Sequence, residues 1–123
     1  MTATVVESSI NGVTVLAPLG GRLDASGCGE FRRRLEEILA RGQTLVVCDL
    51  SSVPFMDSTG LGVLLGALRA LSGRGRLACS GAVPAVRKLF EVTRLDQGLM
   101  GVYDTVEGAV EALSGIENRG DRP

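Results

Sequence analysis

Residues 45–66 read LVVCDLSSVPFMDSTGLGVLLG, which is an apolar run, a loop and the start of a helical pattern. The run Leu45–Cys48 is continuously apolar rather than alternating, as is typical of a strand that is covered on both faces. A loop through Pro54 follows, and the spacing of the leucines then predicts a helix from Ser58 to about Leu71. A strand that leads into a helix in this way indicates a parallel sheet with helices packed against it.

The same alternation of strand and helix continues on both sides of this stretch. Upstream, Asn11–Gly12 between apolar segments favours a two-residue hairpin turn of type I′, which predicts antiparallel strands over 4–10 and 13–19. The other predicted elements are a glycine-rich loop over 20–27, a helix over about 28–41, a strand over 76–80, a helix from Pro84 to about Val92, a strand over 99–103 and a helix that begins at Asp104 or Thr105. The predicted fold is therefore a single α/β domain with a mixed, mostly parallel β-sheet, an N-terminal β-hairpin and about four helices.

Length and composition suit one domain that needs neither a metal nor a disulfide in order to fold. The chain has 123 residues, of which 45% are hydrophobic and 22% are charged, the ordinary mixture of a globular domain. The last amphipathic stripe ends at Leu113, so the domain is predicted over 1–113. The polar remainder, 114–123, is predicted to be a disordered tail.

Composition also argues against several functional classes. The absence of histidine removes Ser-His-Asp and Cys-His catalysis, and the net charge of −1 argues against a nucleic-acid binder or a polybasic membrane anchor. The cysteines, Cys28, Cys48 and Cys79, form no CxxC pair, which leaves no zinc or thioredoxin-type site and fits free thiols in the cytoplasm. No signal peptide and no membrane-length apolar run is seen. We therefore expect a cytoplasmic protein that is not an enzyme and has no cofactor, metal, nucleic-acid or membrane partner.

Known nucleotide-binding and catalytic motifs fail on spacing in the segment 55–66. Gly60 and Gly62 fit the first part of a dinucleotide fingerprint, but Leu65 stands where the third glycine is needed. A P-loop needs a Gly-Lys-Ser/Thr sequence, and a nucleophile elbow needs glycine where Met56 stands. The alternative of a small flavodoxin-like enzyme or nucleotide-binding protein therefore has no matching motif in this segment.

Two compatible interpretations apply to Ser58, which follows Asp57 at the predicted start of a helix. Asp and Ser both accept hydrogen bonds from first-turn amides, so the pair can serve simply as a helix cap. Ser58 can also be a phosphorylation site, because the free amides and the positive end of the helix dipole tolerate a phosphate of about −1.5 to −2 charges.

The predicted helix from Ser58 has two unlike faces. Its leucines are expected to face the core: Leu61, Leu64, Leu65, Leu68 and Leu71. The opposite side carries small, nearly uncharged residues: Gly62, Val63, Gly66 and Ala70, with Ala67 nearby. Glycine inside a helix costs about 1 kcal/mol relative to alanine, so this face suggests close approach by another element. Packing within the chain and docking of a partner protein both remain open.

The string Asp57-Ser58-Thr59-Gly60-Leu61-Gly62, preceded by Asp49-Leu50-Ser51-Ser52-Val53, resembles the signature of the STAS domain. More narrowly it is similar to the bacterial anti-sigma-factor antagonists, and the loop Gly21-Arg22-Leu23-Asp24 and the strand–helix order match as well. The similarity covers about residues 4–113.

This resemblance implies a partner switch. The unphosphorylated protein would bind an anti-sigma-factor serine kinase and thereby free the sigma factor; phosphorylation of Ser58, or of Thr59 as a fallback, would end the binding, and a metal-dependent serine phosphatase would restore it. The expected partner-binding residues are Asp24, Asp57, Ser58, Thr59, Gly60, Gly62, Val63 and Gly66. The protein is expected to be a monomer or weak dimer. An alternative is a STAS module that acts as a scaffold or transporter accessory without phosphorylation.

Overall fold

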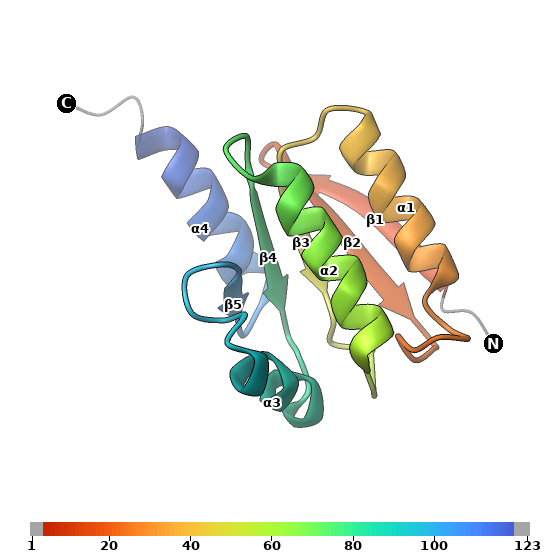
Figure 1. Ribbon diagram of the computed structural model, residues 1–123. Helices are drawn as coiled ribbons and strands as arrows, with labels where there is room; N and C mark the ends of the chain where they lie inside the picture. Colours follow the sequence, from red (N-terminus) through yellow and green to blue (C-terminus); the bar gives the residue numbers. More distant parts are fainter. Residues whose placement is uncertain (1–3, 120–123) are drawn as a thin grey trace.

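The computed structural model describes residues 4–119 as one five-stranded sheet with helices on both faces (Figure 1). The elements in chain order are β1 Thr4–Ile10, β2 Val13–Leu19, α1 Gly29–Ala40, β3 Leu45–Asp49, α2 Ser58–Leu71, β4 Arg76–Ser80, α3 Pro84–Thr93, β5 Gly101–Tyr103 and α4 Val106–Arg119. The predicted fold class is confirmed, and the predicted bounds of the first two strands and of β4 agree with the structure.

The sheet follows the order of the sequence, β1-β2-β3-β4-β5. Strands β1 and β2 pair antiparallel, and every later pair is parallel. Asn11 and Gly12 join the first two strands with φ values of 52° and 81°, both positive as a type I′ turn requires. Because β2 and β3 are parallel, the loops that leave their carboxyl ends emerge at the same edge of the sheet.

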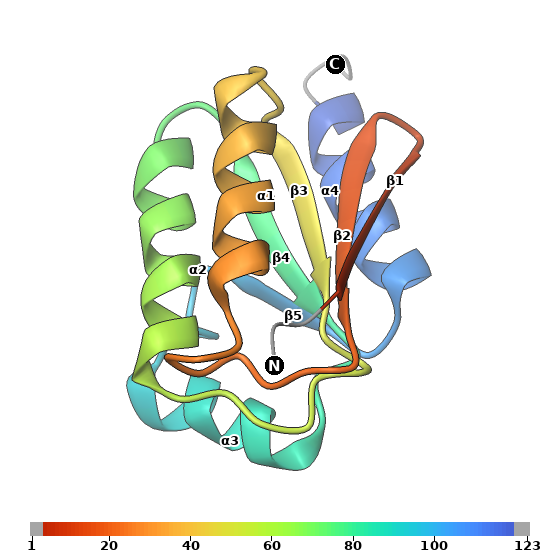
Figure 2. The ribbon, with the colours of Figure 1, turned by 90° about the vertical axis from the view of Figure 1, so that its right-hand side faces the viewer.

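Two hydrophobic clusters lie on opposite faces of the sheet. Figure 2 shows α1 and α2 against one face and α4 against the other. The first cluster joins α1, α2 and α3 to side chains such as Leu16, Val46 and Cys48, and the second joins α4 to others such as Val13 and Val47. Residues that alternate along β2 and β3 are therefore buried on both faces, which explains why these strands are apolar almost throughout.

The C-terminal part differs from the prediction in two places. Strand β5 begins at Gly101 rather than at residue 99, because the chain turns at Gly98 with φ 91° and leaves Leu99 65% exposed. In place of the tail expected over 114–123, helix α4 continues to Arg119, and residues 120–123 lie outside the described part. Among residues 4–119, no helix combines the length and apolarity needed to cross a membrane.

Candidate functional site

Two loops meet at the amino end of α2, at the bottom of Figure 2. The backbone N–H of Leu23 donates to Phe55 O at 3.0 Å, and the N–H of Asp57 donates to Leu23 O at 3.3 Å. Leu23 and Met56 thus form a parallel bridge outside the main strands. The Asp24 loop and the Asp57–Ser58 turn therefore lie together at one edge of the sheet.

Asp57 caps α2, and Ser58 stands free beside it. The Asp57 side chain accepts a hydrogen bond from the Thr59 N–H at 2.8 Å, so this carboxylate satisfies one of the amides that a helix start leaves open. Ser58 is the first residue of the helix and is exposed, and its hydroxyl makes no hydrogen bond within residues 4–115. The capping interpretation therefore holds for Asp57, and the Ser58 hydroxyl is accessible for modification.

Asp24 organises its own loop. Its Oδ1 accepts hydrogen bonds from Ser26 N, Ser26 Oγ and Gly27 N at 3.2, 3.1 and 2.8 Å, and Oδ2 lies 3.5 Å from Arg22 Nε. Partial desolvation raises the pKa of this carboxyl, but the Ser26 and Gly27 hydrogen bonds and the Arg22 charge outweigh it, so its pKa is lowered overall. Asp24 is half-buried and shapes the loop surface beside Ser58.

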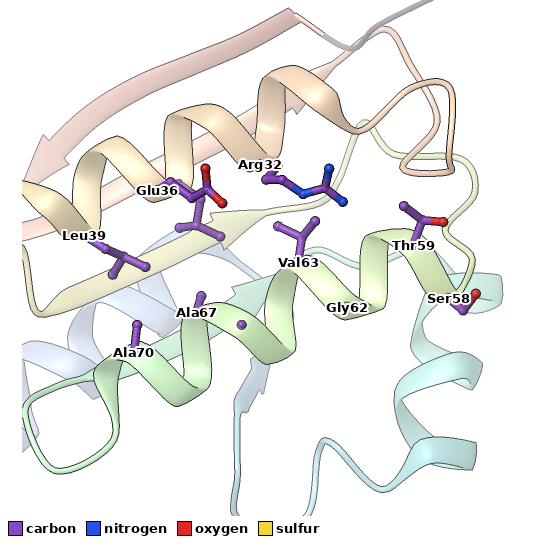
Figure 3. Close-up of a pocket in the computed structure, with 11 residues that line it drawn as sticks. Arg32, Glu36, Leu39, Ser58, Thr59, Gly62, Val63, Ala67 and Ala70 are labelled. Atoms are coloured by element: carbon purple, nitrogen blue, oxygen red, sulfur yellow. The ribbon is translucent and has the colours of Figure 1, made fainter.

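A groove of about 630 Å³ runs between α1 and α2 and ends at Ser58 (Figure 3). Its mouth carries Ser58 and Thr59, and its floor carries Val63 and Ala67. The α1 wall is formed by Arg32, Leu35, Glu36 and Leu39, and the α2 wall also includes Gly62, Gly66 and Ala70. The small side chains of α2 keep the groove open, and its lining is mainly apolar.

The two faces of α2 are rotated from those predicted. Val63 and Ala67, which we placed on the small outer face, are buried toward α1, whereas Leu65 and Leu68 are only half-buried. Periodicity locates the apolar side of a helix but does not show that a second helix covers part of the other side. Packing within the chain thus accounts for Val63 and Ala67.

Gly62 and Gly66 have no such neighbour. Both are exposed, and a Cβ atom built on either would meet nothing within 4 Å. Together with Ala70 they leave an open strip along α2, available to an external partner.

Gly60 has a different role. It is buried, and a Cβ there would lie 2.5 Å from Leu23 O and 2.8 Å from Met56 Cγ. Gly60 therefore lets the Leu23 loop pack closely on the first turn of α2. This position places it beneath the surface that presents Asp57, Ser58 and Thr59, rather than on it.

The sequence did not reveal the α1 wall. A run of arginines followed by Glu36 and Glu37 is typical of any solvated helix face, so it does not mark Arg32 as part of a groove. The available signal was the helical spacing of Leu35 and Leu39, because parallel neighbouring strands place their crossover helices side by side. Among the described residues, no group of three or more His, Cys, Asp or Glu side chains is arranged to hold a metal ion.

Comparison with known proteins agrees with this architecture. Residues 7–103 match the family described as "Mlab, STAS domain". An anti-sigma F factor antagonist of Lysinibacillus sphaericus is 32% identical over 107 residues, which are 85% of this chain and 90% of that protein.

Solved structures give the same result. An anti-sigma factor antagonist from Mycobacterium paratuberculosis superposes with a TM-score of 0.82 at 25% identity, over 89% of this chain and 92% of that one. The Bacillus cell fate determinant SpoIIAA, solved in its phosphorylated form, superposes with a TM-score of 0.68 at 26% identity, over 89% and 98%. The family match and these relatives together show that the chain belongs to the STAS family, among the bacterial anti-sigma-factor antagonists.

Proposed function

We propose that this protein is an anti-sigma-factor antagonist that is switched by phosphorylation of Ser58. In the unphosphorylated state it binds an anti-sigma factor that is also a serine kinase, and this binding releases the sigma factor. The kinase then phosphorylates Ser58, the complex dissociates, and a metal-dependent serine phosphatase removes the phosphate. The names of the relatives support the antagonist role, and the phosphorylated form of SpoIIAA supports the modification.

The observation that carries the proposal is the position of Ser58. Its hydroxyl is exposed at the mouth of the α1–α2 groove, on the first turn of a helix whose cap is already supplied by Asp57. A kinase can reach this hydroxyl without breaking any hydrogen bond described for residues 4–119.

The proposed docking surface surrounds Ser58. It consists of the Asp24 loop, Asp57, Thr59 and the open strip of α2 formed by Gly62, Gly66 and Ala70, with Val63 at the floor of the groove. Gly60 contributes indirectly because it holds the Leu23 loop against the helix.

Phosphorylation would block this surface locally. A phosphate carries about −1.5 to −2 charges at neutral pH and would stand beside the Asp57 carboxylate. Burying such a charge in the complex carries a desolvation penalty of several kcal/mol, and about 4 kcal/mol corresponds to a roughly thousandfold loss of affinity. No refolding is required for release.

The test has two arms. Phosphopeptide mass spectrometry on protein from resting and stressed host cells should find phosphate on Ser58 whose occupancy changes with condition. Purified anti-sigma-factor kinases of the same host should then bind wild type and Ser58→Ala tightly and Ser58→Asp about a thousandfold more weakly.

Ser72→Asp is the matched control, because Ser72 is also exposed but lies at the opposite end of α2. Equal affinities of wild type and Ser58→Asp would contradict the local electrostatic block. An unmodified Ser58 under every condition would favour the non-phosphorylated scaffold.

A further inference from the structure

Helix α1 carries a run of arginines, and most of them are paired. Arg33 lies 2.7 Å from carboxylate oxygens of both Glu30 and Glu37. Arg34 bonds to Glu7 on β1 at 3.2 Å. Among the side chains of residues 4–115, Arg32 forms no ion pair and no side-chain hydrogen bond, although it stands next to these paired arginines.

The unpaired Arg32 faces the groove. It lines the same groove as Ser58 and Thr59, on the opposite wall. Figure 3 shows its guanidinium group extending along the groove in the direction of Thr59, while Glu36, also on this wall, stands farther from this end of the groove. The positively charged Arg32 therefore lines the same groove as the hydroxyl that we propose is phosphorylated.

The other charges near the mouth are already engaged. Asp57 accepts the Thr59 amide, and Asp24 is bound by its own loop and by Arg22. Arg22 itself stacks over the Phe55 ring, with its guanidinium carbon 4.2 Å from the ring centroid. Arg32 is thus the groove-lining cation that a new anion at this end of α2 would attract without losing a described contact.

We propose that Arg32 is the intramolecular counter-ion of a phosphoryl group on Ser58. This inference rests on the proposed function and adds the residue that stabilises its phosphorylated state. Guanidinium binds phosphate through paired, charge-assisted hydrogen bonds, and the open amides of the α2 first turn face the same oxygens. The ion pair would offset repulsion from Asp57 and join α1 to α2 across the groove mouth. Phosphorylation would then also cover the docking strip next to Gly62.

The test uses protein with phosphoserine incorporated at position 58 by genetic encoding, so that no kinase is needed. The titration of the phosphate is followed by ³¹P NMR between pH 5 and 8. The chain contains no histidine, so no side chain that ordinarily titrates near pH 6.5 distorts the curve. Wild type is compared with Arg32→Gln, with Arg32→Lys and with Arg33→Gln.

A nearby cation favours the dianion and lowers the midpoint of the titration. Arg32→Gln should therefore raise the midpoint by about half a pH unit, the size expected for a solvent-screened ion pair. Arg32→Lys should have a midpoint close to that of wild type, because lysine keeps the positive charge. Arg33→Gln removes the same charge one residue along the helix, from a side chain that does not line the groove, and should leave the midpoint nearly unchanged.

An unchanged midpoint in Arg32→Gln, or equal shifts in Arg32→Gln and Arg33→Gln, would overturn the proposal. Because the phosphate is installed during synthesis, this result does not depend on whether a kinase modifies Ser58 in the host. Failure of the Arg32 inference is therefore distinguishable from failure of the phosphorylation switch.

Discussion

The two glycines that flank Leu61 should respond in opposite ways to the same substitution. A methyl group at Gly60 would lie 2.5 Å from the backbone oxygen of Leu23, far inside the ordinary contact distance of about 3.5 Å. A methyl group at Gly62 would meet nothing within 4 Å. Both positions are helical, so both gain about 1 kcal/mol of helix propensity when glycine becomes alanine.

At Gly60, the steric cost of the added methyl group should exceed the gain in helix propensity. The oxygen that the new methyl meets belongs to the main chain, so it cannot move away by a rotamer change. Its shift would strain the hydrogen bonds that tie Leu23 to Phe55 and Asp57. Overpacking of this kind costs about 1–3 kcal/mol, so Gly60→Ala should lose stability by about 1 kcal/mol after the propensity gain.

Gly62→Ala should instead gain stability and lose partner affinity. The propensity gain of up to about 1 kcal/mol corresponds to a rise in Tm of about 4 °C for a domain of this size. The added methyl would project into the proposed docking strip, so binding to the anti-sigma-factor kinase should weaken although the fold is more stable.

Calorimetry and urea unfolding on wild type and the two variants measure the stabilities, and titration with the purified kinase measures the affinities. A Gly60→Ala variant at least as stable as wild type, or a Gly62→Ala variant less stable than wild type, would contradict the expected opposite effects. An unchanged affinity of Gly62→Ala would remove position 62 from the docking surface while leaving the packing argument intact.

Two further predictions concern the cap and the edge strand. Asp57→Ala should lower the free energy of unfolding by about 1 kcal/mol in urea titrations, because the Asp57 carboxylate caps α2. Ser58→Ala should stay within about 0.5 kcal/mol of the wild-type value, and equal losses in the two variants would show that both side chains cap the helix. The hydrogen bond from Arg41 lowers the pKa of Glu7; desolvation opposes this shift, and Arg34 adds to it. The ionised Glu7 therefore stabilises the folded state fully above the ordinary Glu pKa, and this contribution is lost as the pH falls through the lowered pKa. Glu7→Gln should therefore be less stable than wild type at pH 7, by less than about 1 kcal/mol because the ion pair with Arg41 is solvated, and equally stable near pH 2. A stability difference that persists near pH 2 would show that it does not come from ionisation of Glu7.

The elements of this fold were predictable where local chemistry determines them. Asn11–Gly12 sets the hairpin turn, and Pro84 begins α3 as the sequence predicts. The end of α4 was not predictable, because the amphipathic pattern of the sequence ends at Leu113 while the helix continues to Arg119.

The site was predictable only in part. Its serine, its cap and the meeting of the two loops follow from the pattern and from parallel pairing of β2 and β3. The α1 wall is a tertiary feature, because Arg32 gains its significance from the helix beside it and not from its neighbours in sequence. For the same reason, the burial of Val63 could not be distinguished from exposure by helical periodicity alone.

In helix α2, the residues that pack into the core differ from those that face the solvent. Gly60, Leu61 and Leu64 are buried, while Gly62, Gly66 and Ala70 face outward. The outward positions can therefore accept new side chains without a cost to the interior. Duplicated copies of such a gene could diverge at these positions until each recognised only its own kinase. Several signalling circuits could then operate side by side in one cell without cross-talk, all built on an unchanged interior.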